Sequence, residues 1–134
     1  MIGMRDPERV ILDSNSPRNE RIMAIFKLGL RGKSEDIELI KEALFHDPSP
    51  CVRHEAAFAL GETAAMFVVP DLIRAMETDG NPFVVHESAL ALGTLGDRRA
   101  LEPLRKLTKH PNPDVSETAE IALERLLSSE ETYS

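Results

Sequence analysis

The sequence predicts an all-α solenoid, a row of about four helical hairpins that repeats every 32 residues. Three observations predict it: a phrase that recurs at a fixed period, apolar residues at three- and four-residue steps, and prolines that avoid helix interiors. One hairpin cannot bury its own apolar face, whereas several hairpins in a row share a continuous core. We therefore expect one superhelical domain in the 134 residues.

Three phrases that each end in glycine set the period. They are RIMAIFKLG at 21–29, RHEAAFALG at 53–61 and VHESALALG at 85–93. Their glycines, Gly29, Gly61 and Gly93, lie 32 residues apart, and we expect each glycine to mark the end of a helix. A fourth, degenerate copy, PDVSETAEIALERL, begins at Pro113, is shifted by one residue and lacks the glycine.

Each copy contains an outer helix followed by an inner helix that carries the glycine phrase. In the second copy, Val52, Ala56, Ala59 and Leu60 form one apolar stripe along the inner helix. The outer helices show the same spacing, as in VVPDLIRAM at 68–76. Every copy therefore has two amphipathic helices, which is the unit that a helical solenoid stacks.

Prolines and small polar residues mark where the inner helices begin. First-turn prolines and the capping residues before them are expected at Pro17, Pro50, Pro82 and Pro113 and at Ser16, Ser49 and Asn81. The single domain, 1–134, then divides into repeats at approximately 4–31, 32–63, 64–95 and 96–127. Residues 1–13 are expected to supply the first outer helix, and 128–134 a frayed polar tail.

The charge and composition exclude several classes of function. With 16 basic and 23 acidic residues, the net charge is −7 and no basic stretch exists to bind nucleic acid or an anionic membrane. No apolar run approaches the roughly 18 residues that a membrane helix needs. The single cysteine cannot form an internal disulfide. We expect a cytoplasmic protein that binds neither nucleic acid nor membrane, and its charge suits a cationic ligand or a basic protein.

Histidine and glutamate stand side by side in the two central copies, as His54-Glu55 and His86-Glu87. The second pair contains the only ionisable residues between Asn81 and Gly96. A helix that is apolar nearly all round is buried on most sides, and a buried charge needs a partner. Some interaction should therefore compensate the second pair.

Equivalent helices of adjacent repeats lie about 10 Å apart, so we expect the two imidazoles to reach toward each other with the carboxylates beside them. Histidine and carboxylate in a site with open positions suit non-haem iron. Small neighbours, Ala57, Gly61, Ala89 and Gly93, would leave room for a ligand. A plainer interpretation stays open, because duplication copies residues without function and the pairs could be solvated or bonded across the groove.

Two phrases with the motif, CVRHEAAFALGE and NPFVVHESALALGTLGD, and the fourth copy PDVSETAEIALERL resemble deoxyhypusine hydroxylase. The hairpins themselves resemble short HEAT-type repeats of the kind found in phycobilin lyases. The hydroxylase family has two similar halves of four hairpins, with His-Glu in the second and third hairpin of each half. It binds two irons through these motifs and uses dioxygen to hydroxylate the deoxyhypusine side chain of a translation factor. This sequence matches one half over roughly 5–127.

The resemblance implies a metal site and a partner. His54, His86 and Glu87 would be iron ligands, and Glu55 would be a ligand or a catalytic carboxylate that binds substrate. A homodimer with opposed concave faces would complete a di-iron monooxygenase site, acting on a basic or lysine-bearing protein. Two alternatives without a metal remain: a HEAT-repeat adaptor that binds a protein in its concave groove, and a scaffold for a chromophore or partner enzyme, as in the phycobilin lyases.

Overall fold

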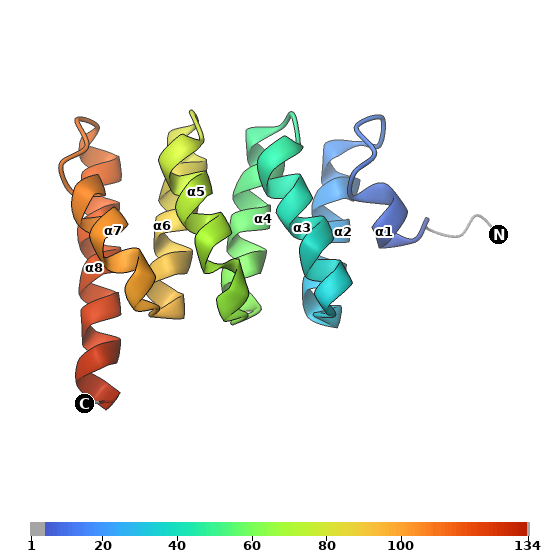
Figure 1. Cartoon of the computed structure of the whole chain (residues 1–134). Coiled ribbons are helices and arrows are strands. Elements are labelled where there is room, and N and C mark those ends of the chain that lie inside the picture. The colour runs from blue at the N-terminus through green and yellow to red at the C-terminus, as the bar shows by residue number, and fades with distance from the viewer. Residues whose placement is uncertain (1–4, 134) are drawn as a thin grey trace.

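The computed structural model describes the backbone of residues 5–133 and the side chains of residues 5–129, and it confirms the all-α solenoid (Figure 1). No strand occurs within 5–133. The helices are α1 (Pro7–Val10), α2 (Arg18–Arg31), α3 (Ser34–His46), α4 (Pro50–Glu62), α5 (Val69–Thr78), α6 (Pro82–Leu95), α7 (Leu101–Leu107) and α8 (Pro113–Tyr133), with 3₁₀ turns at Met66–Val68 and Arg98–Ala100. None of these helices is long and apolar enough to cross a membrane.

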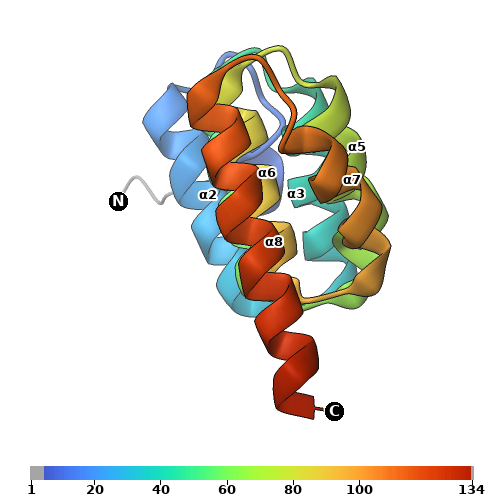
Figure 2. The same cartoon turned by 90° about the vertical axis from the view of Figure 1, so that its left-hand side faces the viewer.

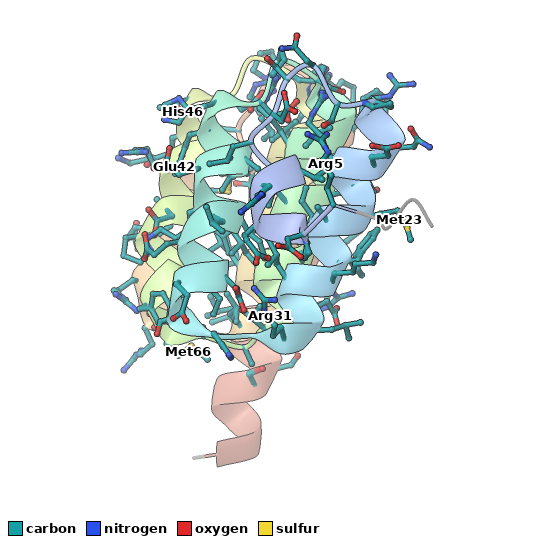
Figure 3. All side chains as sticks on the ribbon, turned by 90° about the vertical axis from the view of Figure 1, so that its right-hand side faces the viewer. Arg5, Met23, Arg31, Glu42, His46 and Met66 are labelled. Atoms are coloured by element: carbon teal, nitrogen blue, oxygen red, sulfur yellow. The ribbon has the colours of Figure 1, made fainter. Side chains whose placement is uncertain are left out.

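The hairpins stand in a row and form two layers (Figure 2). Helices α2, α4, α6 and α8 make the inner layer, and α1, α3, α5 and α7 make the outer layer. In Figure 3, Glu42 and His46 project from the outer layer on one side, while Met23 projects from α2 on the opposite side. We call the exposed side of the inner layer, which carries Met23, His54, Phe58, Phe83 and Ile121, the inner face.

An aliphatic core lies between the two layers. Its largest fully buried side chains are Ile11, Ile25, Leu28, Ile40, Leu44, Leu60, Leu72, Leu92, Leu104 and Leu126. Every hairpin contributes to this set, as expected of repeats that cannot bury their apolar faces alone. Helix α6 is enclosed on most sides and buries Val84, Val85, Ser88 and Leu92, in agreement with its all-round apolar sequence.

The predicted helix starts hold with one shift, but only one of the three predicted capping residues caps its helix. Ser16 lies one residue before Pro17, the residue that precedes α2, and that helix has no side-chain cap. Pro50, Pro82 and Pro113 are the first residues of their helices, whereas Pro17 lies one residue before α2. Asn81 caps α6 by accepting a hydrogen bond from the backbone N–H of Phe83 at 2.9 Å. Ser49, at the same position before α4, makes no such bond with its side chain.

The prediction that the three recurring glycines end helices was wrong. Gly29, Gly61 and Gly93 lie inside α2, α4 and α6, and the positive-φ residues that end α2 and α6 are Gly32 and Gly96. In a sequence, a glycine that ends a helix and a glycine inside the last turns of a helix give the same periodic pattern. The pattern therefore could not distinguish the two.

Two of these glycines let neighbouring inner helices touch. A Cβ on Gly61 would lie 2.8 Å from the Cβ of Ala91, and one on Gly93 would lie 2.9 Å from the backbone of Ala122. The small residues Ala57 and Ala89 are likewise fully buried. The expectation that these small residues leave room for a ligand was therefore wrong, because the next helix fills the space.

The two ends of the chain differ from expectation in length. Within the described part of 1–13, the first outer helix is the single turn α1. At the other end, α8 continues to Tyr133, so the polar tail expected from residue 128 is helical. No glycine or proline follows Pro113 to end the helix, and a Cβ on Gly96 would lie 3.4 Å from the side chain of Ser129. At Ser129, α8 therefore still lies against the end of α6, so the helix continues past the expected start of the tail.

Candidate metal centre

The predicted motif residues lie on neighbouring helices of the inner layer. His54 and Glu55 belong to α4, and His86 and Glu87 belong to α6. All four are half-buried. Because Gly61 lets α4 and α6 approach closely, side chains on the facing flanks of the two helices can reach each other.

His54 joins two carboxylates across this boundary. Its Nε2 lies 3.2 Å from Oε2 of Glu87 on α6, and its Nδ1 lies 3.3 Å from Oε1 of Glu55 on its own helix. The side chain of His54 is 31% exposed and that of Glu87 14%, so solvent reaches the imidazole more than the carboxylate behind it. The structure thus brings together three of the four predicted residues.

His86 makes a different contact. Its Nδ1 lies 2.7 Å from Oγ1 of Thr118, which is a buried residue of α8. We expected the two imidazoles to reach toward each other, but each one reaches toward the following repeat instead. The inner helices are staggered, so that the fifth residue of one helix meets the sixth residue of the next: His54 meets Glu87, and His86 meets Thr118.

The donor atoms suit a metal ion in part. Two ligands at right angles on one ion, each about 2.1 Å from it, lie about 3 Å apart. The 3.2 Å between His54 Nε2 and Glu87 Oε2 is close to that spacing. An imidazole with a carboxylate is a donor set that iron accepts. Among residues 5–129, however, no three His, Cys, Asp or Glu side chains converge in a metal-holding group.

A groove opens beside His86 between α6 and α8. Its volume is about 430 Å³, and it is lined by Pro82, Phe83, His86, Asn112, Asp114, Val115, Glu117, Thr118 and Ile121. Phe83 and Ile121 supply exposed apolar walls, and Asp114 and Glu117 supply exposed carboxylates. The groove therefore offers an apolar surface with negative charge next to the second motif.

Two arginine–aspartate ion pairs between neighbouring repeats were not predicted from the sequence. Nε of Arg21 lies 2.9 Å from Oδ2 of Asp47, and Nε of Arg53 lies 2.9 Å from Oδ2 of Asp79. Each aspartate also accepts a backbone N–H two residues on, at 2.9 Å. Arg53 directly precedes His54, so its ion pair anchors the turn of α4 that carries the first motif.

A periodic signal for these pairs was present. Arg21 and Arg53 are 32 residues apart, as are Asp47 and Asp79, and each arginine precedes its aspartate by 26 residues. Thr118 gave no such signal, because it has no counterpart of its own kind in the other copies.

The sequence profile of HEAT repeats matches residues 37–124. The chain belongs to the HEAT repeat family. Its stacked hairpins, with two helices in each of the fully formed repeats, are the structural expression of that membership.

The relatives of this HEAT repeat protein include deoxyhypusine hydroxylases. It is 37% identical over 115 residues to the deoxyhypusine hydroxylase of Cryptococcus neoformans var. neoformans serotype D (strain B-3501A), covering 84% of this chain and 32% of that protein. It is 34% identical over 119 residues to the enzyme of Homo sapiens, covering 88% of this chain and 39% of that protein. The chain therefore spans about a third of the first of these proteins and about two fifths of the second.

A solved structure agrees with these sequence matches. Human deoxyhypusine hydroxylase in complex with glycerol superposes with a TM-score of 0.87 at 31% identity, over 94% of this chain and 44% of that one. The predicted resemblance to one half of deoxyhypusine hydroxylase is confirmed.

Proposed function

We propose that this HEAT repeat protein is an iron- and dioxygen-dependent hydroxylase of the deoxyhypusine hydroxylase type. The observation that carries the proposal is the pair formed across a repeat boundary by His54 Nε2 and Glu87 Oε2, 3.2 Å apart. The names of the relatives support the reaction class, and the donor set supports the metal.

In this proposal each motif residue has a separate role. His54, His86 and Glu87 hold the iron, and Glu55 orients the His54 ring by accepting from its Nδ1. When bound, iron would supply the activation of dioxygen. One oxygen atom would be inserted into a C–H bond, and the other would take two electrons from an external reductant and two protons and leave as water. Because Glu55 is half-buried on the inner layer, its carboxylate can also bind an ammonium group of the substrate.

The substrate proposed is a lysine-derived side chain on a basic protein, met in the cytoplasm. A net charge of −7 favours a cationic partner. The carboxylates and apolar walls of the groove beside His86 suit an aliphatic chain that ends in an amine.

We further propose that two copies oppose their inner faces, so that a di-iron site is assembled from the motifs of both chains. Phe83 is 70% exposed on the inner face, and Met23, Phe58 and Ile121 are exposed on the same face of the other inner helices. Exposed apolar residues grouped on one face are typical of an interface. A two-fold axis would set the same face of each chain against the other.

Metal analysis of the purified chain tests the site. We expect about one iron per chain in the wild type and a loss of iron in His54→Ala and in His86→Ala. His46→Ala and His110→Ala are matched controls, because both residues lie outside the motif row, and they should retain iron. A wild type that lacks iron in every oligomeric state, with normal solubility, would contradict the proposal and leave a non-catalytic scaffold.

Light scattering tests the dimer separately. Phe83→Glu should convert a dimer to a monomer, because it sets two like charges against each other at the interface. Phe67→Glu is the control, since Phe67 lies on the turn Met66–Val68 outside the inner layer and is also exposed. A wild type that is monomeric while fully loaded with iron rules out the shared site.

A further inference from the structure

The contact between His86 and Thr118 determines which ring nitrogen of His86 carries a proton. Oγ1 of Thr118 lies 2.7 Å from Nδ1 of His86 and 2.7 Å from the backbone carbonyl oxygen of Asp114. A hydroxyl has one proton to donate, and a carbonyl oxygen can only accept. The proton of Thr118 therefore goes to Asp114, and Thr118 accepts from His86.

The hydrogen-bond network thus assigns the Nδ1–H tautomer to neutral His86. In that tautomer Nε2 has no proton and presents a lone pair. A metal binds an imidazole through such a lone pair, while the other ring nitrogen donates to a fixed acceptor that holds the ring. Thr118 is suited to be that acceptor, because it is buried and its own proton is already engaged.

Thr118 is the structural counterpart of Glu87, not of a histidine. It is the sixth residue of α8, as Glu87 is the sixth of α6, and each is met by the histidine at position five of the preceding inner helix. A carboxylate in that position can bind an ion itself, whereas the hydroxyl of Thr118 is engaged by Asp114 and by Nδ1 of His86 and so orients the ring. At equivalent positions of successive repeats, Glu87 is thus a candidate ligand and Thr118 is a residue that holds a ligand in place.

We propose that Thr118 is a positioning residue that holds His86 with Nε2 free for a metal ion. This inference rests on the proposed metal site, and it adds a residue that the motif does not contain. The groove between α6 and α8 is lined by both side chains, so it gives an ion a path to the ring.

The first test is the tautomer of His86 in the metal-free 134-residue chain, measured from imidazole ¹⁵N shifts by NMR. Wild type and Thr118→Ser should show the proton on Nδ1, because both keep the hydroxyl. Thr118→Val has nearly the same shape but no acceptor, and the Nδ1–H preference should be lost. A proton on Nε2 in the wild type, or an unchanged Nδ1–H tautomer in Thr118→Val, overturns the proposal.

The second test is titration with Fe²⁺ without oxygen, and with Co²⁺ as a spectroscopic probe. Thr118→Val should bind about 10–100-fold more weakly than wild type, the usual effect of removing such a partner. Thr118→Ser should restore wild-type affinity, and Thr118→Ala repeats the loss if the valine variant does not fold. Equal affinity in all variants overturns the proposal. A wild type that binds neither metal defeats the proposed function, and the NMR tautomer then decides the role of Thr118 alone.

Discussion

Two neighbouring boundaries of the inner layer, α4–α6 and α6–α8, share the same helix packing but differ in the side-chain contacts that cross them. At both, a glycine brings the helices into contact, and a histidine reaches one step into the next repeat. At the first of them, Arg53 also pairs with Asp79. At the second, the corresponding positions, 32 residues on, are Val85 and Pro111, so arginine and aspartate are both replaced.

This difference shows that the close approach of two inner helices does not depend on an arginine–aspartate pair between them. The boundary between α6 and α8 retains the glycine contact with Ala122, although Val85 and Pro111 stand at the positions equivalent to Arg53 and Asp79. It also replaces the carboxylate that meets the histidine with the hydroxyl of Thr118. Stability in a solenoid is approximately a sum over neighbouring interfaces. Substitutions at each boundary should therefore report on that boundary alone.

The largest effect is expected where an ion pair is most buried. Arg21 and Asp47, between α2 and α4, have side chains only 6% and 4% exposed. Asp47→Ala leaves Arg21 buried without its carboxylate and should lower the free energy of unfolding by about 3–5 kcal/mol. Urea denaturation measures this value.

Asp79→Ala is the matched control at the next boundary. Its partner Arg53 is 18% exposed, so water can compensate part of the loss and the cost should be smaller. Equal costs for Asp47→Ala and Asp79→Ala would show that burial does not set the strength of these pairs.

Glycine substitutions should give the next largest effect. The loss of stability should differ clearly between the boundaries at Gly61 and Gly93 and the one at Gly29. Gly61→Ala and Gly93→Ala place a methyl group 2.8–2.9 Å from Ala91 and Ala122, and each should cost about 1–3 kcal/mol. At Gly29 the nearest atom is 3.7 Å away, so Gly29→Ala should be neutral or stabilise by up to about 1 kcal/mol. Melting temperatures of the three variants test this order, and a Gly29→Ala variant as unstable as the others would refute it.

A smaller effect is expected from the helix caps. Asn81→Ala removes the bond from Asn81 to the N–H of Phe83 and should cost about 1 kcal/mol. Ser49→Ala, at the same position one repeat earlier, removes no capping bond and should change stability by less than about half of that. Thermal unfolding of both variants decides the matter, and identical losses would mean that the cap contributes nothing.

The smallest effect is expected where the first repeat meets the second, between Arg31 at the end of α2 and Asp36 at the start of α3, away from the α4–α6 and α6–α8 boundaries. The Arg31 guanidinium, hydrogen-bonded to Asp36 at 2.7 and 2.9 Å, holds the pKa of that carboxyl below its ordinary 3.8. A lowered folded-state pKa means that this stabilisation is complete above about pH 3.8 and is lost as pH falls through the lowered value. The stability gap between wild type and Asp36→Asn should therefore shrink on acidification, and a constant gap in urea titrations would exclude this pairing as its cause.

Much of the fold was predictable because each repeat carries its helix signals in the local spacing of apolar residues and prolines. Apolar spacing at three and four residues predicts each helix, and Pro50, Pro82 and Pro113 begin helices as their chemistry requires. The 32-residue period also placed both His-Glu motifs on the inner layer. Helix spacing and helix starts depend on residues within one or two turns of each other, and the period can be read directly along the chain, so the sequence alone determines these features.

Only the tertiary structure decided which residues meet across the repeats. The period aligns His54 with His86, yet the stagger of α4 against α6 pairs His54 with Glu87 and leaves His86 to Thr118. The same packing turned Gly61 from an expected helix end into a contact surface. Stagger arises from how two helix surfaces fit together, which periodicity along a single chain does not encode.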